Sequence, residues 1–176
     1  MTEYTLGLAL EDFLPVIFSS IGLFIISRMV GQGDGRLGQM ALLGWALVTI
    51  GGLLKAIWKL VMALTDTQTN LVWLDKGMFL WMAAGFTLLA VSLWFFDEKR
   101  RGENLPQRVW LFPLGILGIT FGAIVATGFP DVTISTWRFI LLGIMTIGNV
   151  VMVLLLIQQA RRQQLNLAVG LLIANI

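Results

Sequence analysis

The sequence predicts an all-α integral membrane protein that forms a single polytopic domain over residues 1–176. Of its 176 residues, 57% are hydrophobic and only 12% are charged, whereas soluble domains carry about 25% charged residues. The polar residues also gather in short segments between long apolar stretches. Because an aqueous surface could not carry those stretches, a soluble globular protein is excluded.

Five complete transmembrane helices and a sixth, truncated or half-spanning helix follow from the lengths of these stretches. A helix needs about 20 apolar residues to cross the roughly 30 Å hydrocarbon core of a bilayer. The complete spans are predicted at residues 6–30, 37–64, 71–96, 109–127 and 136–160, and the partial span at 165–176. The last segment is too short to cross at 1.5 Å per residue. We therefore expect that the protein continues beyond Ile176. The alternative is that this segment is a half-span packed against partners.

Each predicted span ends at a polar or turn-forming segment. A glycine-rich turn at 31–36 follows the first span, and the polar run 65–70 follows the second. The charged run 97–101 ends the third, and the Gly- and Pro-containing segment 128–131 ends the fourth. Such segments interrupt helices or stay in water, so they are expected to be the connections between spans.

The distribution of basic residues predicts the orientation. The first, third and fifth connections carry eight basic and four acidic residues, a net charge of +4, and the opposite side has a net charge of −2. Basic connections stay in the cytoplasm, so the N-terminus should face outward from the cytoplasmic (inner) membrane. The basic residues expected inside are Arg28, Arg36, Lys99, Arg100, Arg101, Arg108, Arg161 and Arg162.

The absence of both Cys and His narrows the possible chemistry. Thiolate nucleophiles, iron–sulfur ligation, imidazole-bound haem and the common zinc sites are excluded. We expect no cofactor, no metal site and no catalytic residue, and a membrane enzyme, which would need Asp or Glu with Lys, ranks last. No nucleic-acid partner is expected, because the basic residues belong to the connections rather than to a phosphate-binding stripe.

Ionisable residues gather toward the outward-facing end of the first three predicted spans. Lys55 and Lys59 are four residues apart, so they share one face of the second span. Glu11, Asp12 and Asp75 lie at matching depth in the first and third spans, which short connections make neighbours. Because charges inside a span are costly and indicate function by default, these five residues form a predicted outer-leaflet charged cluster.

Depth and helix geometry sharpen the expectation for this cluster. Lys55 should lie about 14 Å inside the end of the second span at 1.5 Å per residue, too deep to reach water easily. Pro15 cannot donate a hydrogen bond to the Glu11 carbonyl, so the first span should kink there. Two interpretations stay open: the charges fix helix register, or they line a path for a solute or ion.

Small residues predict where helices approach closely. Gly115, Gly118, Gly122 and Ala126 share one face of the fourth span, and such faces let helix backbones meet in membranes. We favour packing inside one bundle over a dedicated dimer face.

Two functions are consistent with these features. The first is a small polytopic membrane protein whose outer-leaflet charged cluster binds or conducts a small solute, ion or proton. The alternative is a non-catalytic structural or accessory subunit of a larger membrane complex. The lipid bilayer is a partner in both cases, and other membrane subunits or a second copy of the chain are further candidates.

Overall fold

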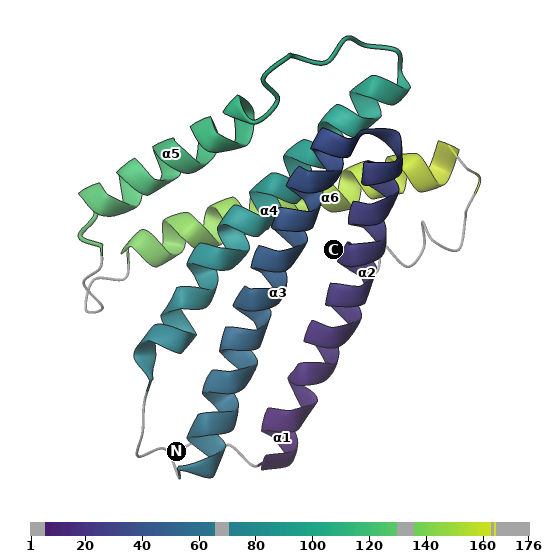
Figure 1. Ribbon diagram of the computed structural model, residues 1–176. Coiled ribbons are helices and arrows are strands. Elements are labelled where there is room, and N and C mark those ends of the chain that lie inside the picture. The colour runs from purple at the N-terminus through teal and green to yellow at the C-terminus, as the bar shows by residue number, and fades with distance from the viewer. Residues whose placement is uncertain (1–5, 66–70, 130–135, 163, 165–176) are drawn as a thin grey trace.

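Every regular element in the described part of the chain is a helix (Figure 1). The computed structural model describes residues 6–65, 71–129, 136–162 and 164. The helices are α1 Leu6–Glu11, α2 Phe13–Gly33, α3 Gly35–Leu64, α4 Val72–Arg100, α5 Leu111–Ala126 and α6 Thr136–Arg162. The predicted partial span at 165–176 lies outside the described residues.

The prediction of an all-helical chain with helices long and apolar enough to span a membrane is confirmed for the described residues. Four helical segments are long and apolar enough to cross a membrane: Leu6–Gly33, which combines α1 and α2, Gly35–Leu64, Val72–Arg100 and Thr136–Arg162. Helix α5 is apolar but has only 16 residues, or about 24 Å at 1.5 Å per residue. Of the helices that correspond to the five predicted complete spans, α5 is the shortest.

Helices α2, α3 and α4 lie side by side, while α6 crosses α4 and α5 runs along α6 (Figure 1). Helices α3 and α4 approach closely near their middles. A Cβ atom added to Gly44 would lie 2.8 Å from the carbonyl oxygen of Gly85, and one added to Gly85 would lie 2.8 Å from that of Gly44. Glycine is thus required on both helices for the backbones to meet.

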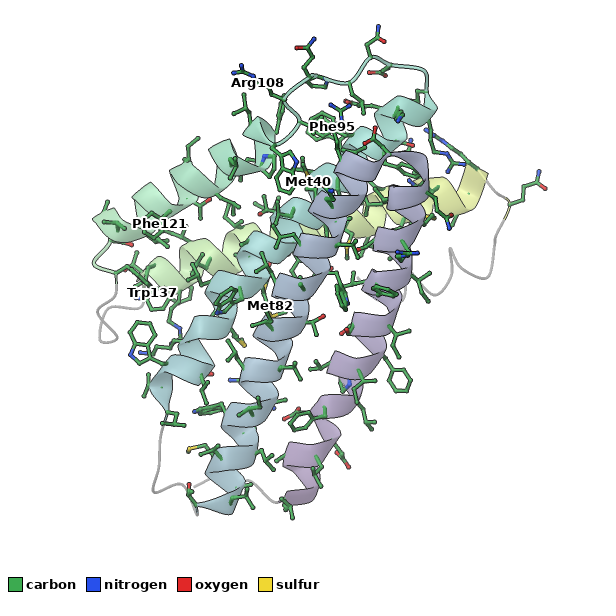
Figure 2. The ribbon with its side chains drawn as sticks, in the orientation of Figure 1. Met40, Met82, Phe95, Arg108, Phe121 and Trp137 are labelled. Atoms are coloured by element: carbon green, nitrogen blue, oxygen red, sulfur yellow. The ribbon has the colours of Figure 1, made fainter. Side chains whose placement is uncertain are left out.

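Larger side chains complete the core beside these glycines. Met82 on α4 packs over Gly51 on α3 (Figure 2). At the start of α6, the buried ring of Trp137 lies 5.3 Å, centroid to centroid, from the ring of Phe129, which in turn approaches Phe121 on α5. These rings connect the start of α6 to α5 and to the segment directly after α5.

The turn expected at 31–36 is much shorter in the structure. Helix α2 continues to Gly33 and α3 begins at Gly35, so only Asp34 is extended, with φ −156° and ψ 119°. Its Oδ1 accepts hydrogen bonds from the backbone N–H groups of Arg36 and Leu37, at 2.9 and 3.3 Å. This N-cap satisfies donors at the start of α3 and allows the chain to reverse at one residue.

The expected interruption in the first span is present. Asp12 separates α1 from α2, three residues before Pro15, whose missing N–H leaves the Glu11 carbonyl without its intrahelical donor.

Two names are used below for the ends of the α2–α3–α4 layer. The lysine end is where α1 begins, α3 ends and α4 begins, and it holds Lys55 and Lys59. The arginine end is where α2 ends, α3 begins and α4 ends, and it holds Arg36, Arg101 and Arg162.

Candidate functional site

Lys55 joins α3 to α4 at the lysine end. Its Nζ forms an ion pair and hydrogen bond with Oδ1 of Asp75 on α4. The same ammonium group lies 4.3 Å from the ring centroid of Trp58, a distance at which cation and ring attract each other. The side chains of Lys55 and Asp75 are 31% and 22% exposed, so the ion pair is only partly buried.

Lys59 joins α3 to the break between α1 and α2. Its Nζ lies 2.5 Å from Oδ2 of Asp12, with side chains 24% and 30% exposed. Among the described residues, no donor reaches that oxygen in good hydrogen-bonding geometry, so the attraction is ionic rather than directional. Asp12 is the residue that interrupts the helix, and the break is what brings its carboxylate beside α3.

The structure therefore arranges the predicted cluster as two separate pairs. One lysine of α3 pairs with the helix before it in sequence and the other with the helix after it. Glu11, which ends α1, is exposed and forms no ion pair with any described residue. Four of the five predicted site residues are thus brought into contact, and Glu11 is not.

Both pairs have a chemical property that a fully enclosed ion pair lacks. Each holds a fixed cation and anion in contact, with about a quarter of each side chain still accessible. Each charged group therefore keeps part of its surface open to a second charged group. The two pairs can equally fasten three helices together, and the geometry permits both roles.

Sequence reasoning missed a polar network between α2 and α3. The indole N–H of Trp45 donates to the carbonyl and Oγ of Ser20, at 2.9 and 3.0 Å, and Thr49 Oγ1 lies 3.1 Å from the same Oγ. Polar side chains bond across helices in this way within apolar surroundings. The i, i+4 spacing of Trp45 and Thr49 was the available signal.

The arginine end contains a buried carboxylate that was predicted only as part of a charged run. Asp97 is 1% exposed and is shared by two guanidinium groups. Arg101 reaches it from one turn further along the chain, and Arg162 reaches it from α6 at 2.7 Å. The ends of α4 and α6 are therefore fixed together here.

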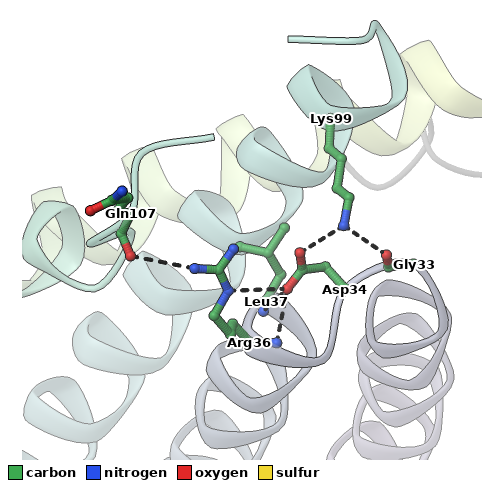
Figure 3. A network of polar contacts seen from close by, with 6 residues as sticks. All are labelled: Gly33, Asp34, Arg36, Leu37, Lys99 and Gln107. Atoms are coloured by element: carbon green, nitrogen blue, oxygen red, sulfur yellow. Dashed lines mark hydrogen bonds and ion pairs between the residues drawn. The ribbon is translucent and has the colours of Figure 1, made fainter. Parts of the chain in front are cut away.

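A second network at this end surrounds Asp34 (Figure 3). Lys99 Nζ donates to Asp34 Oδ2 at 2.7 Å and to the Gly33 carbonyl at 3.1 Å. Burial raises the pKa of Asp34, but the hydrogen bonds from Lys99 and from two backbone N–H groups outweigh burial and hold the pKa below its ordinary value.

These contacts bring the three basic connections to one end of the molecule. Lys99 meets Asp34, Arg36 reaches the Gln107 carbonyl at 3.4 Å, and Arg162 meets Asp97. Residues of the three predicted basic connections therefore contact one another or their neighbours at the arginine end.

The predicted packing face of α5 has no neighbour among the described residues. Gly115, Gly118, Gly122 and Ala126 are all exposed, and a Cβ atom added to any of the three glycines would meet nothing within 4 Å. Helix α5 instead turns Pro113, Thr120 and Ile124 inward. The small residues thus make no close helix contact inside the described chain.

Comparison with protein-family models, with curated proteins and with solved structures found no match to this chain, so the placement of these charges is what supports a functional proposal.

Proposed function

We propose that this chain is a small polytopic protein of the cytoplasmic membrane whose charged lysine end binds or conducts a small solute, ion or proton. In this proposal five helices cross the bilayer and the N-terminus lies outside. Helix α5 crosses together with its flanking residues, since 109–127 would extend about 28 Å as a helix, close to the roughly 30 Å of a bilayer core.

The orientation rests on the basic residues of the arginine end. Their excess favours the cytoplasmic side, which makes the lysine end the outer one. Cysteines introduced at Leu71 and Asn104 test this directly, since the chain has none of its own and both positions are exposed. An impermeant thiol reagent added to whole cells should label the Leu71→Cys variant only. Labelling of the Asn104→Cys variant alone would reverse the orientation.

The observation that carries the functional proposal is the position of Lys55. Nine residues separate it from the end of α3, which places it about 14 Å along the helix axis. Its ammonium group nevertheless forms an ion pair with Asp75, and its side chain is partly exposed. Ionisable residues at such depth in membrane helices are characteristic of substrate and proton paths.

The helix break at Asp12 adds support. Interrupted helices in transporters place free carbonyl groups and side chains beside their ion and substrate sites. Here the Glu11 carbonyl lacks its donor because of Pro15, and the adjacent carboxylate of Asp12 contacts Lys59. Oxygen acceptors and a cation therefore lie together beside the Lys55 pair.

Reconstituted liposomes test this proposal. A pH-sensitive dye trapped inside should report faster collapse of an imposed pH gradient with the protein than without it, and Na⁺ and K⁺ gradients should be tested in the same way. The double variant Lys55→Met/Asp75→Asn, which leaves no unpaired charge, should fold and lose the flux. The charge-removing control Arg100→Gln, at the arginine end, should retain it. Flux equal to that of empty liposomes for all three gradients, or full flux in the double variant, would overturn the proposal.

The exposed face of α5 favours membrane-complex assembly as a second candidate function. Small-residue faces let transmembrane helices approach closely, and this one is vacant within the described chain. Purification in mild detergent should then recover a partner chain or a second copy, and Gly118→Leu should release it. Gly143→Leu on α6 is the matched control, since a Cβ atom there also meets nothing within 4 Å. A single species with no companion in wild-type preparations would count against this candidate.

A further inference from the structure

A groove with a partly polar lining lies between α2 and α3 at the arginine end. Its volume is about 250 Å³, equivalent to about eight water molecules at roughly 30 Å³ each. The groove can therefore hold a group the size of a phosphate with part of a glycerol. Its lining includes Arg28, Gly31 and Gln32 from α2 and Gly35, Gly38 and Gln39 from α3.

Glycines create the space in this groove. A Cβ atom on Gly38 would overlap the Cα of Gly31, so the two helices meet there with no side chain between them. Beside that contact, a Cβ atom on Gly35 would meet nothing within 4 Å. The groove is thus open where Gly35 stands, and its polar groups come from the surrounding side chains.

Arg28 supplies an uncompensated positive charge to the groove. It is exposed and forms no ion pair or hydrogen bond with any described residue. The nearby carboxylate of Asp34 is occupied by Lys99, by Arg36 and by the backbone N–H groups of α3 (Figure 3). The buried hydroxyl of Ser27 is likewise occupied by the carbonyls of Leu23 and Ala41.

The donors left in the groove suit one phosphate group. A guanidinium group offers paired N–H donors that match the oxygens of a phosphate, and the side-chain amides of Gln32 and Gln39 supply further donors. With a single guanidinium group in the lining, the groove matches one monoanionic phosphodiester.

We propose that this groove binds the phosphodiester headgroup of an anionic phospholipid. Arg28 lies five residues before the end of α2, about 8 Å along its axis, a depth at which its side chain reaches the headgroups. Basic pockets between transmembrane helices on the cytoplasmic side bind such headgroups. The choice of leaflet rests on the orientation given under Proposed function, whereas the chemistry of the groove is independent of the lysine end.

Native mass spectrometry of the full chain in nonionic detergent tests the inference. Phosphatidylglycerol should bind about tenfold more tightly than zwitterionic phosphatidylcholine, and Arg28→Gln should weaken phosphatidylglycerol binding about tenfold. Arg161→Gln is the matched control, because it removes the same charge at the same end outside the groove, and it should change the affinity less than about twofold. Equal losses in the two variants would show diffuse attraction and overturn the site.

A steric variant and a competitor give independent outcomes. Gly35→Leu should fold, since its side chain enters open space, and should weaken phosphatidylglycerol binding by filling the groove. Unchanged binding in this variant would overturn the site. Inorganic phosphate at millimolar concentration should not displace the lipid, and displacement would identify free phosphate as the ligand instead.

Failure of this inference is distinguishable from failure of the proposed function. Arg28→Gln should keep any flux in liposomes, and Lys55→Met/Asp75→Asn should keep phosphatidylglycerol binding.

Discussion

The two ends of the helix layer hold their charges in different ways. At the arginine end, one carboxylate that is 1% exposed is shared by two guanidinium groups, and the adjacent helices meet through bare glycines. At the lysine end, each carboxylate has one lysine, and every partner is between 22% and 31% exposed. The difference lies in the carboxylates, because the arginines that meet Asp97 are themselves 45–46% exposed. The arginine end therefore encloses an anion between two cations, whereas the lysine end holds two one-to-one pairs in which both partners are partly exposed.

The largest expected effect is at Asp97. Replacing it with Asn leaves two arginines without their shared anion, and breaking a buried ion pair typically costs about 3–5 kcal/mol. Because both arginine side chains are nearly half exposed, we expect a loss near the lower limit, about 3 kcal/mol. Unfolding in mixed micelles measures it, with Glu103→Gln as an exposed control that should change little. A loss below about 1 kcal/mol would mean that the ion pairs of Asp97 stabilise the fold no more than an exposed pair does.

A smaller effect is expected at Lys55. The change Lys55→Met leaves Asp75 unpaired at a partly exposed site, so the cost should lie between that of a surface pair, about 0–1 kcal/mol, and that of a buried one, about 3–5 kcal/mol. Adding Asp75→Asn should recover most of the loss, because no unpaired charge then remains. The same unfolding measurement applies. A single variant as stable as wild type would mean that the pair is fully hydrated.

Backbone contact should also differ between the two ends. Gly38→Ala places a methyl group against the Gly31 backbone, whereas Gly77→Ala, near the start of α4, meets nothing within 4 Å. Overpacking typically costs about 1–3 kcal/mol, so we expect that loss at Gly38 and none at Gly77. Equal stability of the two variants would show that the helices are not held together at the arginine end.

The smallest expected effect is the pH dependence of the arginine end. The pKa of Asp34 is lowered from its ordinary value of 3.8. Its contribution to stability is therefore present above that value and lost as the pH falls through the lower folded-state pKa. An exposed pair contributes about 0–1 kcal/mol, so stability measured from pH 6 to pH 2 should fall slightly less in Asp34→Asn than in wild type. An identical acid profile would contradict the role assigned to Asp34.

The sequence was sufficient to predict the helices and part of the candidate site. Apolar stretches of span length located the helices, Pro15 located the break at Asp12, and the i, i+4 spacing of Lys55 and Lys59 placed both on the face that meets carboxylates. These inferences succeed because each depends on local geometry or on the nearest neighbours in the chain.

The remaining features depend on relations that local patterns do not contain. The burial of Asp97 requires Arg162, 65 residues later, to arrive where α6 crosses α4. The vacancy beside Gly118 depends on how α5 is rotated against α6. The one-residue turn at Asp34 needs both a capping carboxylate and the Gly31–Gly38 contact, and the glycine-rich composition of 31–36 was wrongly interpreted as a longer flexible turn.

The contact between Gly31 and Gly38 also has a mechanical consequence. It marks the point about which α2 and α3 would pivot, because the backbones touch there and the chain reverses a few residues away. Lys59 stands 25 residues beyond Asp34, about 38 Å along the helix axis. Opening the angle between α2 and α3 by only about 5° would move the far ends apart by about 3 Å over this length, enough to separate Lys59 from Asp12. A small change of angle at the arginine end would thus be enough to make or break an ion pair at the lysine end.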